Sequence, residues 1–255
     1  MAKEFIPTDE QQKILSIENG SHLVLAPPGS GKTELLAHRV FNAKNSGLQD
    51  NEIICLTFTN RAAKGMKERI DSKYPNNDII IGNVHHFCSM FLSRNKLIPL
   101  NASVLDEEEA DQIVRELKVE FDYPPNKKDN NGNLIIGRDG KPVKEEIYNP
   151  NLLKLATYLK QKELGFPENL FLKPKPTELP DPWKAKQLCE AYNREKQENN
   201  YLDFDDLLTL TYHHLTNMDK ENLFLSQFKW VQVDEVQDLN PLQWAIINEI
   251  TKKIL

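Results

Sequence analysis

Ala-Pro-Pro-Gly-Ser-Gly-Lys-Thr, at residues 26–33 of this 255-residue chain, is the stretch that decides the fold. It follows an apolar run, His22–Ala26, that we expect to form a buried strand, and it leads into a helix predicted over Lys32–Ser46. The two glycines let the backbone turn so tightly that successive N–H groups converge on phosphate oxygens, and the helix adds the positive end of its dipole. The order strand, glycine-rich loop, helix therefore predicts a nucleotide-binding α/β domain.

Within this loop, two polar side chains have an expected task. Lys32 would neutralise phosphate charge, and the hydroxyl of Thr33 would bind Mg²⁺. The two prolines have no N–H, so the amides of residues 29–33 must form the phosphate cradle. The motif usually starts with glycine, where this chain has Ala26. The alternative to a phosphate-binding loop is a chance glycine turn before a helix.

A second stretch, Trp-Val-Gln-Val-Asp-Glu-Val-Gln-Asp at residues 230–238, places two carboxylates directly after an apolar strand. Ligands of open α/β folds bind at this carboxyl edge of the sheet. Asp234 would hold Mg²⁺, and Glu235 would orient and deprotonate an attacking water, with Gln237 as a polar relay. An isolated Asp-Glu pair is more often solvated surface, but together with the loop it indicates a nucleotide-hydrolysing site.

Composition excludes several classes of protein. The net charge of -6 argues against a protein that coats nucleic acid uniformly, so nucleic-acid contacts would use a local groove. The apolar runs are far shorter than a membrane span, and the N-terminus lacks a signal peptide pattern. Three widely spaced cysteines, Cys55, Cys88 and Cys189, suit a reducing compartment. These features predict a cytoplasmic protein without membrane partners.

Strands and helices are expected to alternate along the first ninety residues. We predict strands at 53–58 and 78–84, helices at 61–70 and 85–93, and a later strand at 231–233 before a helix that starts at 240–241. This rhythm predicts a parallel sheet flanked by helices. The expected domain comprises residues 1–95 and 201–255.

The middle of the chain, residues 96–200, is expected to form an inserted and mostly helical subdomain. Helices are predicted over 106–121 and 152–163, and a third begins at 181–182. Between them, Asn-Gly and Asp-Gly turns around Leu134–Ile136 indicate a short exposed hairpin in residues 124–144. Seven lysines on the insert indicate either a duplex-facing surface or an ordinary solvated face: Lys154, Lys160, Lys162, Lys173, Lys175, Lys184 and Lys186.

Six sequence blocks in order resemble the N-terminal half of the UvrD/Rep/PcrA-like DNA helicases of superfamily I. The blocks cover most of 7–95 and 201–250, whereas the insert matches by position and helical character only. They are residues 7–12, 26–33, 56–63, 82–87, 203–208 and 234–243. The resemblance implies a RecA-like P-loop NTPase core with ATP and Mg²⁺ as cofactors.

The resemblance also implies roles for individual residues. Gln11 would read the adenine edge, and Gln237 would sense the γ-phosphate and join Lys32 and Glu235 as a catalytic residue. Thr33 and Asp234 would be the metal ligands. The residues implied in nucleotide binding are Gln11, Ala26, Pro27, Pro28, Gly29, Ser30, Gly31, Lys32 and Thr33.

A track for single-stranded DNA is implied as well, formed by Phe58, Thr59, Asn60, Arg61, Asn83 and His85. Phe58 could instead be a core residue at a strand end, and His85-His86 could simply start a helix. The family usually has Thr-Phe where this chain has Asn83-Val84, which removes an aromatic ring from that contact. Asp205 and Asp206 would lie near DNA or a domain junction, or serve as ordinary helix-dipole partners.

For the whole protein, the resemblance implies an ATP-dependent helicase of the DNA-repair type that moves 3′ to 5′ on single-stranded DNA and acts at single/double-strand junctions. Leu255 precedes the motifs of a second motor domain, so the expected partner is that C-terminal domain. Alone, the chain should bind Mg-ATP weakly, hydrolyse it slowly and not unwind duplex. A small-molecule kinase and a non-catalytic DNA- or protein-binding module that retains the fold are the alternatives.

Overall fold

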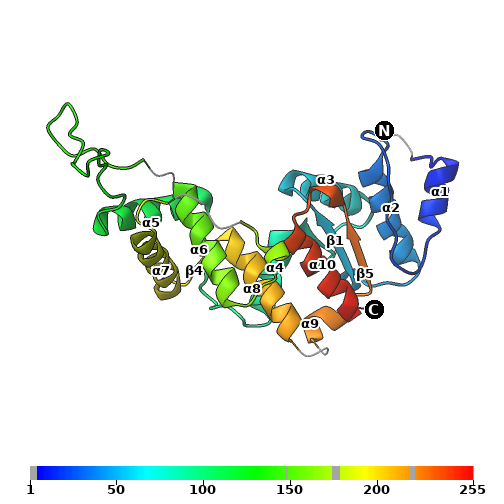
Figure 1. Ribbon diagram of the computed structural model, residues 1–255. Coiled ribbons are helices and arrows are strands. Elements are labelled where there is room, and N and C mark those ends of the chain that lie inside the picture. Colours follow the sequence, from blue (N-terminus) through cyan, green and yellow to red (C-terminus); the bar gives the residue numbers. More distant parts are fainter. Residues whose placement is uncertain (1–4, 147–148, 174–178, 219–221, 255) are drawn as a thin grey trace. The chain divides into compact units, whose positions relative to one another are not determined.

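The computed structural model describes residues 5–146, 149–173, 179–218 and 222–254 (Figure 1). The chain folds into two compact units. The sheet unit comprises residues up to 90, 218–239 and those from 247 onward, and the helical unit comprises residues 91–217 and 240–246. Two helices, α4 (Val84–Arg94) and α10 (Pro241–Ile254), have residues in both units.

Three parallel strands form the centre of the sheet unit, in the order β2 (Ile80–Asn83), β1 (Ile53–Thr57), β5 (Trp230–Val233). In the register, Cys55 of β1 lies opposite Ile81 on one side and Gln232 on the other. All five residues of β1 are buried, as expected for a parallel strand with both faces covered. The predicted α/β fold with a parallel sheet flanked by helices is confirmed.

Helices α2 (Lys32–Asn45) and α3 (Asn60–Lys73) bury one face of β1. Thr59 starts α3 because its hydroxyl accepts the N–H of Ala62 at 3.1 Å, an N-cap that satisfies one of the free donors of the first turn. The core on this face consists of Ala37, Val40, Phe41, Ala43, Ile53, Cys55, Met66, Ile70 and Ile79.

The apolar run before the glycine-rich loop departs from its prediction. His22–Ala26 is irregular rather than a strand, and Leu25 is 87% exposed. A continuous apolar run is local information, whereas a strand also needs a partner for its backbone groups. The prediction of a buried strand at 22–26 is therefore wrong.

The remaining elements of the sheet unit are short. They are α1 (Asp9–Leu15), η1 (Asp50–Glu52), α9 (Leu223–Ser226) and η3 (Val236–Asp238). Within the described residues, no helix combines the length and the apolar character that crossing a bilayer requires.

Three helices form the core of the helical unit: α5 (Glu107–Glu120), α6 (Asn149–Glu163) and α7 (Pro182–Glu198). Asp106 caps α5, since its carboxylate accepts the N–H groups of Glu108 and Glu109. The unit also contains η2 (Glu168–Leu170), α8 (Phe204–Asn217) and a two-stranded parallel pair, β3 (Ser103–Val104) and β4 (Tyr201–Leu202). The helices predicted in the insert are confirmed, while the strand pair was not predicted.

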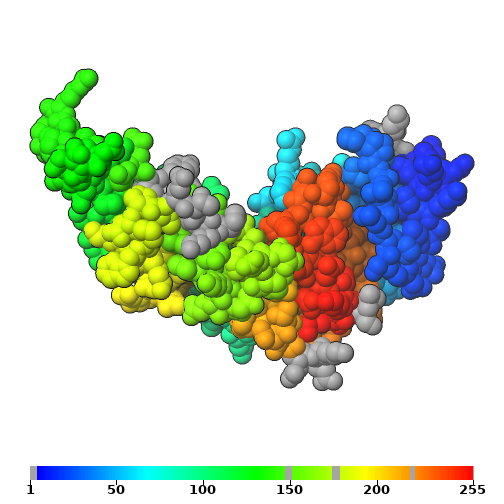
Figure 2. Space-filling view, in the orientation of Figure 1, coloured from blue at the N-terminus to red at the C-terminus, as the bar shows by residue number. Residues whose placement is uncertain are grey.

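Residues 126–144, between α5 and α6, form an excursion with three antiparallel arms rather than a single hairpin. The bridges pair Asn126 with Lys144, Lys128 with Leu134, and Ile136 with Pro142. Gly132 and Gly140 have positive φ, as the two predicted turns require. Figure 2 shows this excursion, in green, standing out from the other residues of the helical unit.

The bounds of the two units differ from the predicted domain bounds. Residues 201–217 and 240–246 group with the helical unit, although the sequence assigns them to the nucleotide-binding domain. The division into 1–95 with 201–255, and 96–200, stays a prediction about domains.

Candidate functional site

The glycine-rich loop turns through two left-handed residues and opens α2. Gly29 has φ 77° and Gly31 has φ 81°, conformations that disfavour side chains. Gly31 is the N-cap of α2, and because it has no side chain it cannot accept a hydrogen bond from the first N–H groups of the helix. Ser30 Oγ is buried and has no hydrogen-bond partner among the described residues. The loop thus presents donors and a positive helix end to an anion.

Lys32 spans from the start of the loop to the end of β5. Its ammonium donates to the carbonyl of Ala26 at 3.3 Å and lies 4.0 Å from Glu235 Oε1. Of the other residues predicted here, Pro27, Pro28 and Gly29 are exposed. The lysine therefore lies between the phosphate loop and the strand-end carboxylates.

Thr33 and Asp234 meet although 201 residues separate them. Thr33 Oγ1 donates to Asp234 Oδ2 at 3.3 Å, and the N–H of Asp234 continues the β5 ladder to the carbonyl of Leu56 at 2.8 Å. Burial, followed by the charge of Glu235, raises the pKa of Asp234, although its hydrogen bonds and Lys32 oppose the shift. Because burial disfavours its charged form, the Asp234 carboxylate would be stabilised by a nearby cation. Together with the hydroxyl of Thr33 it makes a suitable donor set for Mg²⁺.

Glu235 follows the strand in a strained backbone conformation. Its φ of 52° is left-handed, which is uncommon for a residue with a side chain and is frequent at functional sites. The carboxylate accepts the amide of Gln237 at 2.5 Å, and the backbone N–H donates to Asp234 Oδ1 at 3.0 Å. The two adjacent carboxylates therefore have different partners: Asp234 accepts Thr33, and Glu235 accepts Gln237.

Gln11 contacts the loop but uses its amide within the protein. Its oxygen accepts the N–H of Thr8 at 2.9 Å, which completes a capping box on α1, and its nitrogen donates to the carbonyl of Ser30 at 3.1 Å. One lone pair and one amide hydrogen remain for other partners. The structure places Gln11 at the phosphate loop, and its contact with adenine stays a prediction.

The residues of the predicted DNA track follow the neighbouring strands β1 and β2. Phe58 is 43% exposed, so it is not the core residue of the alternative interpretation. Asn83 donates to Asn60 Oδ1 at 2.9 Å and caps the N–H of His86, linking the two strand ends. Thr59, Asn60 and Arg61 are exposed.

His85 lies in the first turn of α4 and is partly exposed, whereas Val84 before it is buried. The position where the family usually has a ring therefore contributes to the core here. Across the described residues, no group of three or more His, Cys, Asp or Glu side chains could hold a metal ion.

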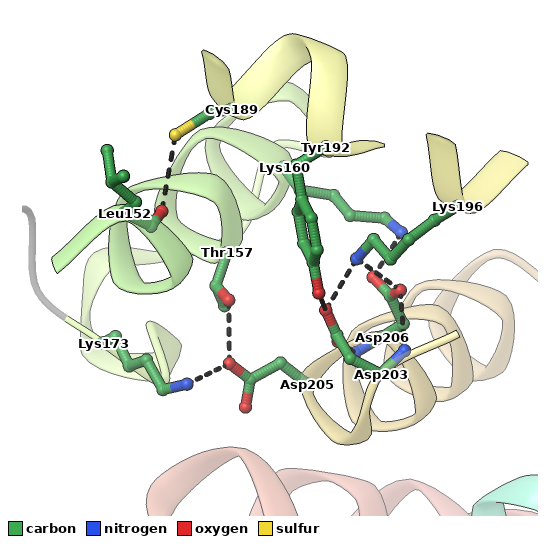
Figure 3. A network of polar contacts seen from close by, with 10 residues as sticks. All are labelled: Leu152, Thr157, Lys160, Lys173, Cys189, Tyr192, Lys196, Asp203, Asp205 and Asp206. Atoms are coloured by element: carbon green, nitrogen blue, oxygen red, sulfur yellow. Dashed lines mark hydrogen bonds and ion pairs between the residues drawn. The ribbon is translucent and has the colours of Figure 1, made fainter. Parts of the chain in front are cut away.

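The block at 203–208 takes part in an internal network of the helical unit (Figure 3). Asp206 is 3% exposed and accepts Lys160 at 2.6 Å and Lys196 at 2.7 Å. Asp205 accepts the hydroxyl of Thr157 at 2.7 Å and pairs with Lys173 at 2.5 Å. Asp206 is thus occupied by protein groups and is not available to touch DNA.

This network also bears on the seven lysines of the insert. Lys160 and Lys173 bind Asp206 and Asp205, Lys186 lies 3.7 Å from Glu190, and Lys184 donates to the carbonyl of Asp122. Lys175 lies outside the described residues. Sequence reasoning missed Lys196, which is buried and bridges Asp203 and Asp206.

Comparisons with known proteins show which family this chain resembles. The family model described as UvrD/REP helicase N-terminal domain matches residues 7–254. The chain is 27% identical over 251 residues to the ATP-dependent DNA helicase PcrA of Bacillus subtilis, covering 95% of this chain and 31% of that protein. It is 30% identical over 231 residues to the ATP-dependent DNA helicase SRS2 of Saccharomyces cerevisiae, covering 86% of this chain and 19% of that protein.

A further relative is the putative ATP-dependent DNA helicase YjcD of Bacillus subtilis, 26% identical over 93% of this chain and 29% of that protein. The chain thus spans about a third or less of the length of these curated relatives. With a family model that matches nearly its whole length, the chain belongs to the UvrD/REP helicase N-terminal domain family.

Proposed function

We propose that this chain supplies the ATP- and Mg²⁺-binding part of an ATP-dependent DNA helicase. The observation that carries the proposal is the contact between Thr33 and Asp234, with Lys32 beside Glu235. It joins the phosphate loop to the strand-end carboxylates, which is the combination that phosphoryl transfer requires. A small-molecule kinase does not account for the polar residues at the ends of β1 and β2.

The residues present fit a nucleotide with its metal. The buried hydroxyl of Ser30, which has no hydrogen-bond partner in the described part of the chain, and the start of α2, which has no side-chain cap, suit phosphate oxygens. Thr33 and Asp234 would hold Mg²⁺, which keeps several ligands from water and phosphate and so needs few from the protein. When bound, Mg²⁺ would neutralise charge on the phosphates.

The chain's own groups would then carry the hydrolytic step. Glu235 would accept a proton from the attacking water, and Lys32, 4.0 Å from it, would stabilise negative charge on the phosphate oxygens. Gln237, which now donates to Glu235 at 2.5 Å, would report the presence of the γ-phosphate by changing partner. These roles rest on the arrangement of the side chains and on the family.

Substitutions test the site directly. Lys32→Ala should lower ATP affinity at least tenfold, measured by calorimetry, whereas Glu235→Gln should keep nucleotide binding and lose hydrolysis. Lys67→Ala, which removes an exposed lysine paired with Asp71 on α3, is the matched control and should change neither. Unchanged ATP affinity in Lys32→Ala would instead favour a non-catalytic DNA- or protein-binding module.

We also propose that single-stranded DNA and its junctions with duplex contact Phe58, Thr59, Asn60, Arg61, Asn83 and His85, with 3′ to 5′ movement in the whole protein. The exposed ring of Phe58 can stack on any base. Phe58→Ala should weaken single-strand affinity by about 1–3 kcal/mol, measured by fluorescence anisotropy. A binding constant that does not fall with salt would contradict phosphate contacts on this track.

For residues 1–255 alone, we propose slow ATP turnover and no unwinding. The relatives are about three or more times longer, and related phosphoryl-transfer sites gain a factor of about 10³ to 10⁵ from an added arginine. A C-terminal motor domain is therefore the proposed partner. Rapid DNA-stimulated turnover by this chain alone would refute the proposal. A cytoplasmic location also stays a prediction.

A further inference from the structure

A groove of about 460 Å³ opens on the helical unit where α5 ends and the excursion of residues 126–144 returns. It belongs to neither the nucleotide site nor the DNA track described above. Its lining consists of Arg115, Lys118, Val119, Asp122, Tyr123 and Lys144.

The charge of the lining is positive, with three cations and one carboxylate. The carboxylate of Asp122 accepts Lys144 at 2.6 Å, and this bond, together with the lysine's charge, lowers the pKa of Asp122. Arg115 donates through Nε to the carbonyl of Asp111 at 3.3 Å, and in the described part of the chain no carboxylate lies within ion-pair distance of its guanidinium. The planar guanidinium of Arg115 can therefore donate to a carboxylate of a bound ligand.

The groove also has an apolar part. Val119 is 83% exposed, although it lies on a helix that buries Ala110, Val114 and Leu117. Tyr123 is buried, and its hydroxyl donates to the carbonyl of Pro180 at 2.7 Å, which fixes the ring. Val119 therefore supplies the exposed apolar surface of the groove, and the fixed ring of Tyr123 forms part of its wall, which suits an apolar side chain of a ligand.

We propose that this groove binds an acidic peptide segment of a partner protein, with a carboxylate on Arg115 and an aliphatic or aromatic side chain against Val119. Cations placed around a small apolar surface match a peptide that carries both kinds of group.

The surroundings favour a short peptide over nucleic acid. Glu116 and Glu120 are exposed on α5 next to the lining residues. A phosphate backbone extends beyond the groove and would meet these carboxylates, whereas a short segment can stay within it. Apolar surface also contributes little to binding a phosphate chain.

The test uses the full chain and a dye-labelled peptide of four aspartates, two glycines and two phenylalanines, followed by fluorescence anisotropy. Arg115→Ala should weaken binding about tenfold because a charge-assisted hydrogen bond is lost. Val119→Ser should weaken it about fivefold through lost apolar contact. Arg138→Ala, an exposed arginine of the excursion outside the lining, is the matched control and should leave affinity unchanged.

Two altered peptides separate the contributions. Replacing the aspartates with asparagines, or the phenylalanines with glycines, should each abolish measurable binding. All three variants concern exposed side chains, so their thermal unfolding should match that of the unaltered chain.

The proposal is overturned if the peptide does not bind, or if it binds the Arg115 and Val119 variants as well as it binds the unaltered chain. It is also overturned if only a single-stranded or duplex oligonucleotide binds in a way that depends on Arg115. No step requires ATP, so failure here leaves the proposed ATPase unaffected.

Discussion

Two buried carboxylates, one in each unit, have opposite surroundings. Asp234 at the end of β5 is 4% exposed and has a hydroxyl at 3.3 Å as its side-chain donor, with another carboxylate next to it in sequence. Asp206 in α8 is 3% exposed and accepts two lysines within 2.7 Å (Figure 3). The two carboxylates are therefore equally buried, but within the described residues only the charge of Asp206 is balanced by nearby lysines.

The pKa shifts express this difference. Burial raises the pKa of Asp234 and Glu235 raises it further. Burial acts in the same direction on Asp206, but Lys196 and Lys160 outweigh it and lower the pKa of Asp206. A carboxylate whose charge is compensated within the fold stabilises structure, whereas one left short of positive charge is suited to a ligand cation.

The same substitution at both carboxylates should produce the largest contrast. Asp206→Asn should destabilise the chain by about 3–5 kcal/mol, because it removes the charge that Lys196 and Lys160 pair with. Asp234→Asn should change stability by less than about 1 kcal/mol, since among the described residues no buried cation forms an ion pair with Asp234. Urea unfolding of the two full-length variants measures both values, and equal losses would contradict the distinction.

Ligand binding should reverse the order of the two variants. At a Mg-ATP concentration of about 100 times Kd, the unaltered chain should gain about 2.7 kcal/mol of stability. Asp206→Asn should keep this increment, because its network lies outside the nucleotide site, whereas Asp234→Asn should lose most of it. Thermal unfolding with and without Mg-ATP gives the increments, and a full gain in Asp234→Asn would exclude this residue from the metal site.

Sequence pattern indicated the neighbours of the first carboxylate but not the ion pairs of the second. Asp234 follows an apolar strand, and its partner Thr33 belongs to a loop whose residue types are tied to one task, so a contact across 201 residues could be foreseen. Asp206 lies in the first turn of a helix, where acids are common for other reasons. Lys196 looks like any lysine near a helix end, and only tertiary packing reveals its burial.

Dependence on tertiary packing also explains why the strand predicted at His22–Ala26 is absent, whereas those predicted at β1 and β5 are present. An apolar run indicates which residues could be buried, whereas a ladder of backbone hydrogen bonds depends on distant strands. For β1, the partners are β2, where Cys55 lies opposite Ile81, and β5, where Cys55 lies opposite Gln232. Element types and the parallel sheet were therefore predictable over most of the chain, whereas strand order, register and buried ion pairs were not.

Acid should affect the two carboxylates in opposite directions. The lowered pKa of Asp206 contributes stability that is present above the ordinary pKa of 3.8 and is lost as pH falls through its folded value. The raised pKa of Asp234 means that the folded state binds its proton more tightly, so its cost to stability grows as pH rises from 3.8 through its folded value. Relative to the unaltered chain, Asp206→Asn should be less stable and Asp234→Asn slightly more stable near neutral pH. Both differences should shrink in unfolding curves taken toward about pH 3. Differences of the same sign would show that the two sites are not distinct in this way.

The smallest effects should come from the hydroxyls that contact each acidic site. Thr157 donates to Asp205 at 2.7 Å in a site that Lys173 also neutralises, so Thr157→Val should cost about 1 kcal/mol of unfolding free energy. Thr33 donates over the longer distance of 3.3 Å, and Thr33→Val should cost less than about 0.5 kcal/mol. Unfolding by urea resolves the first change, and repeating it with Mg-ATP distinguishes the two hydroxyls. Thr157→Val should respond to Mg-ATP as the unaltered chain does, whereas Thr33→Val should lose most of the response because a metal ligand is gone. If both variants respond fully, Thr33 is a structural partner of Asp234 only, and the metal would have to be held without it.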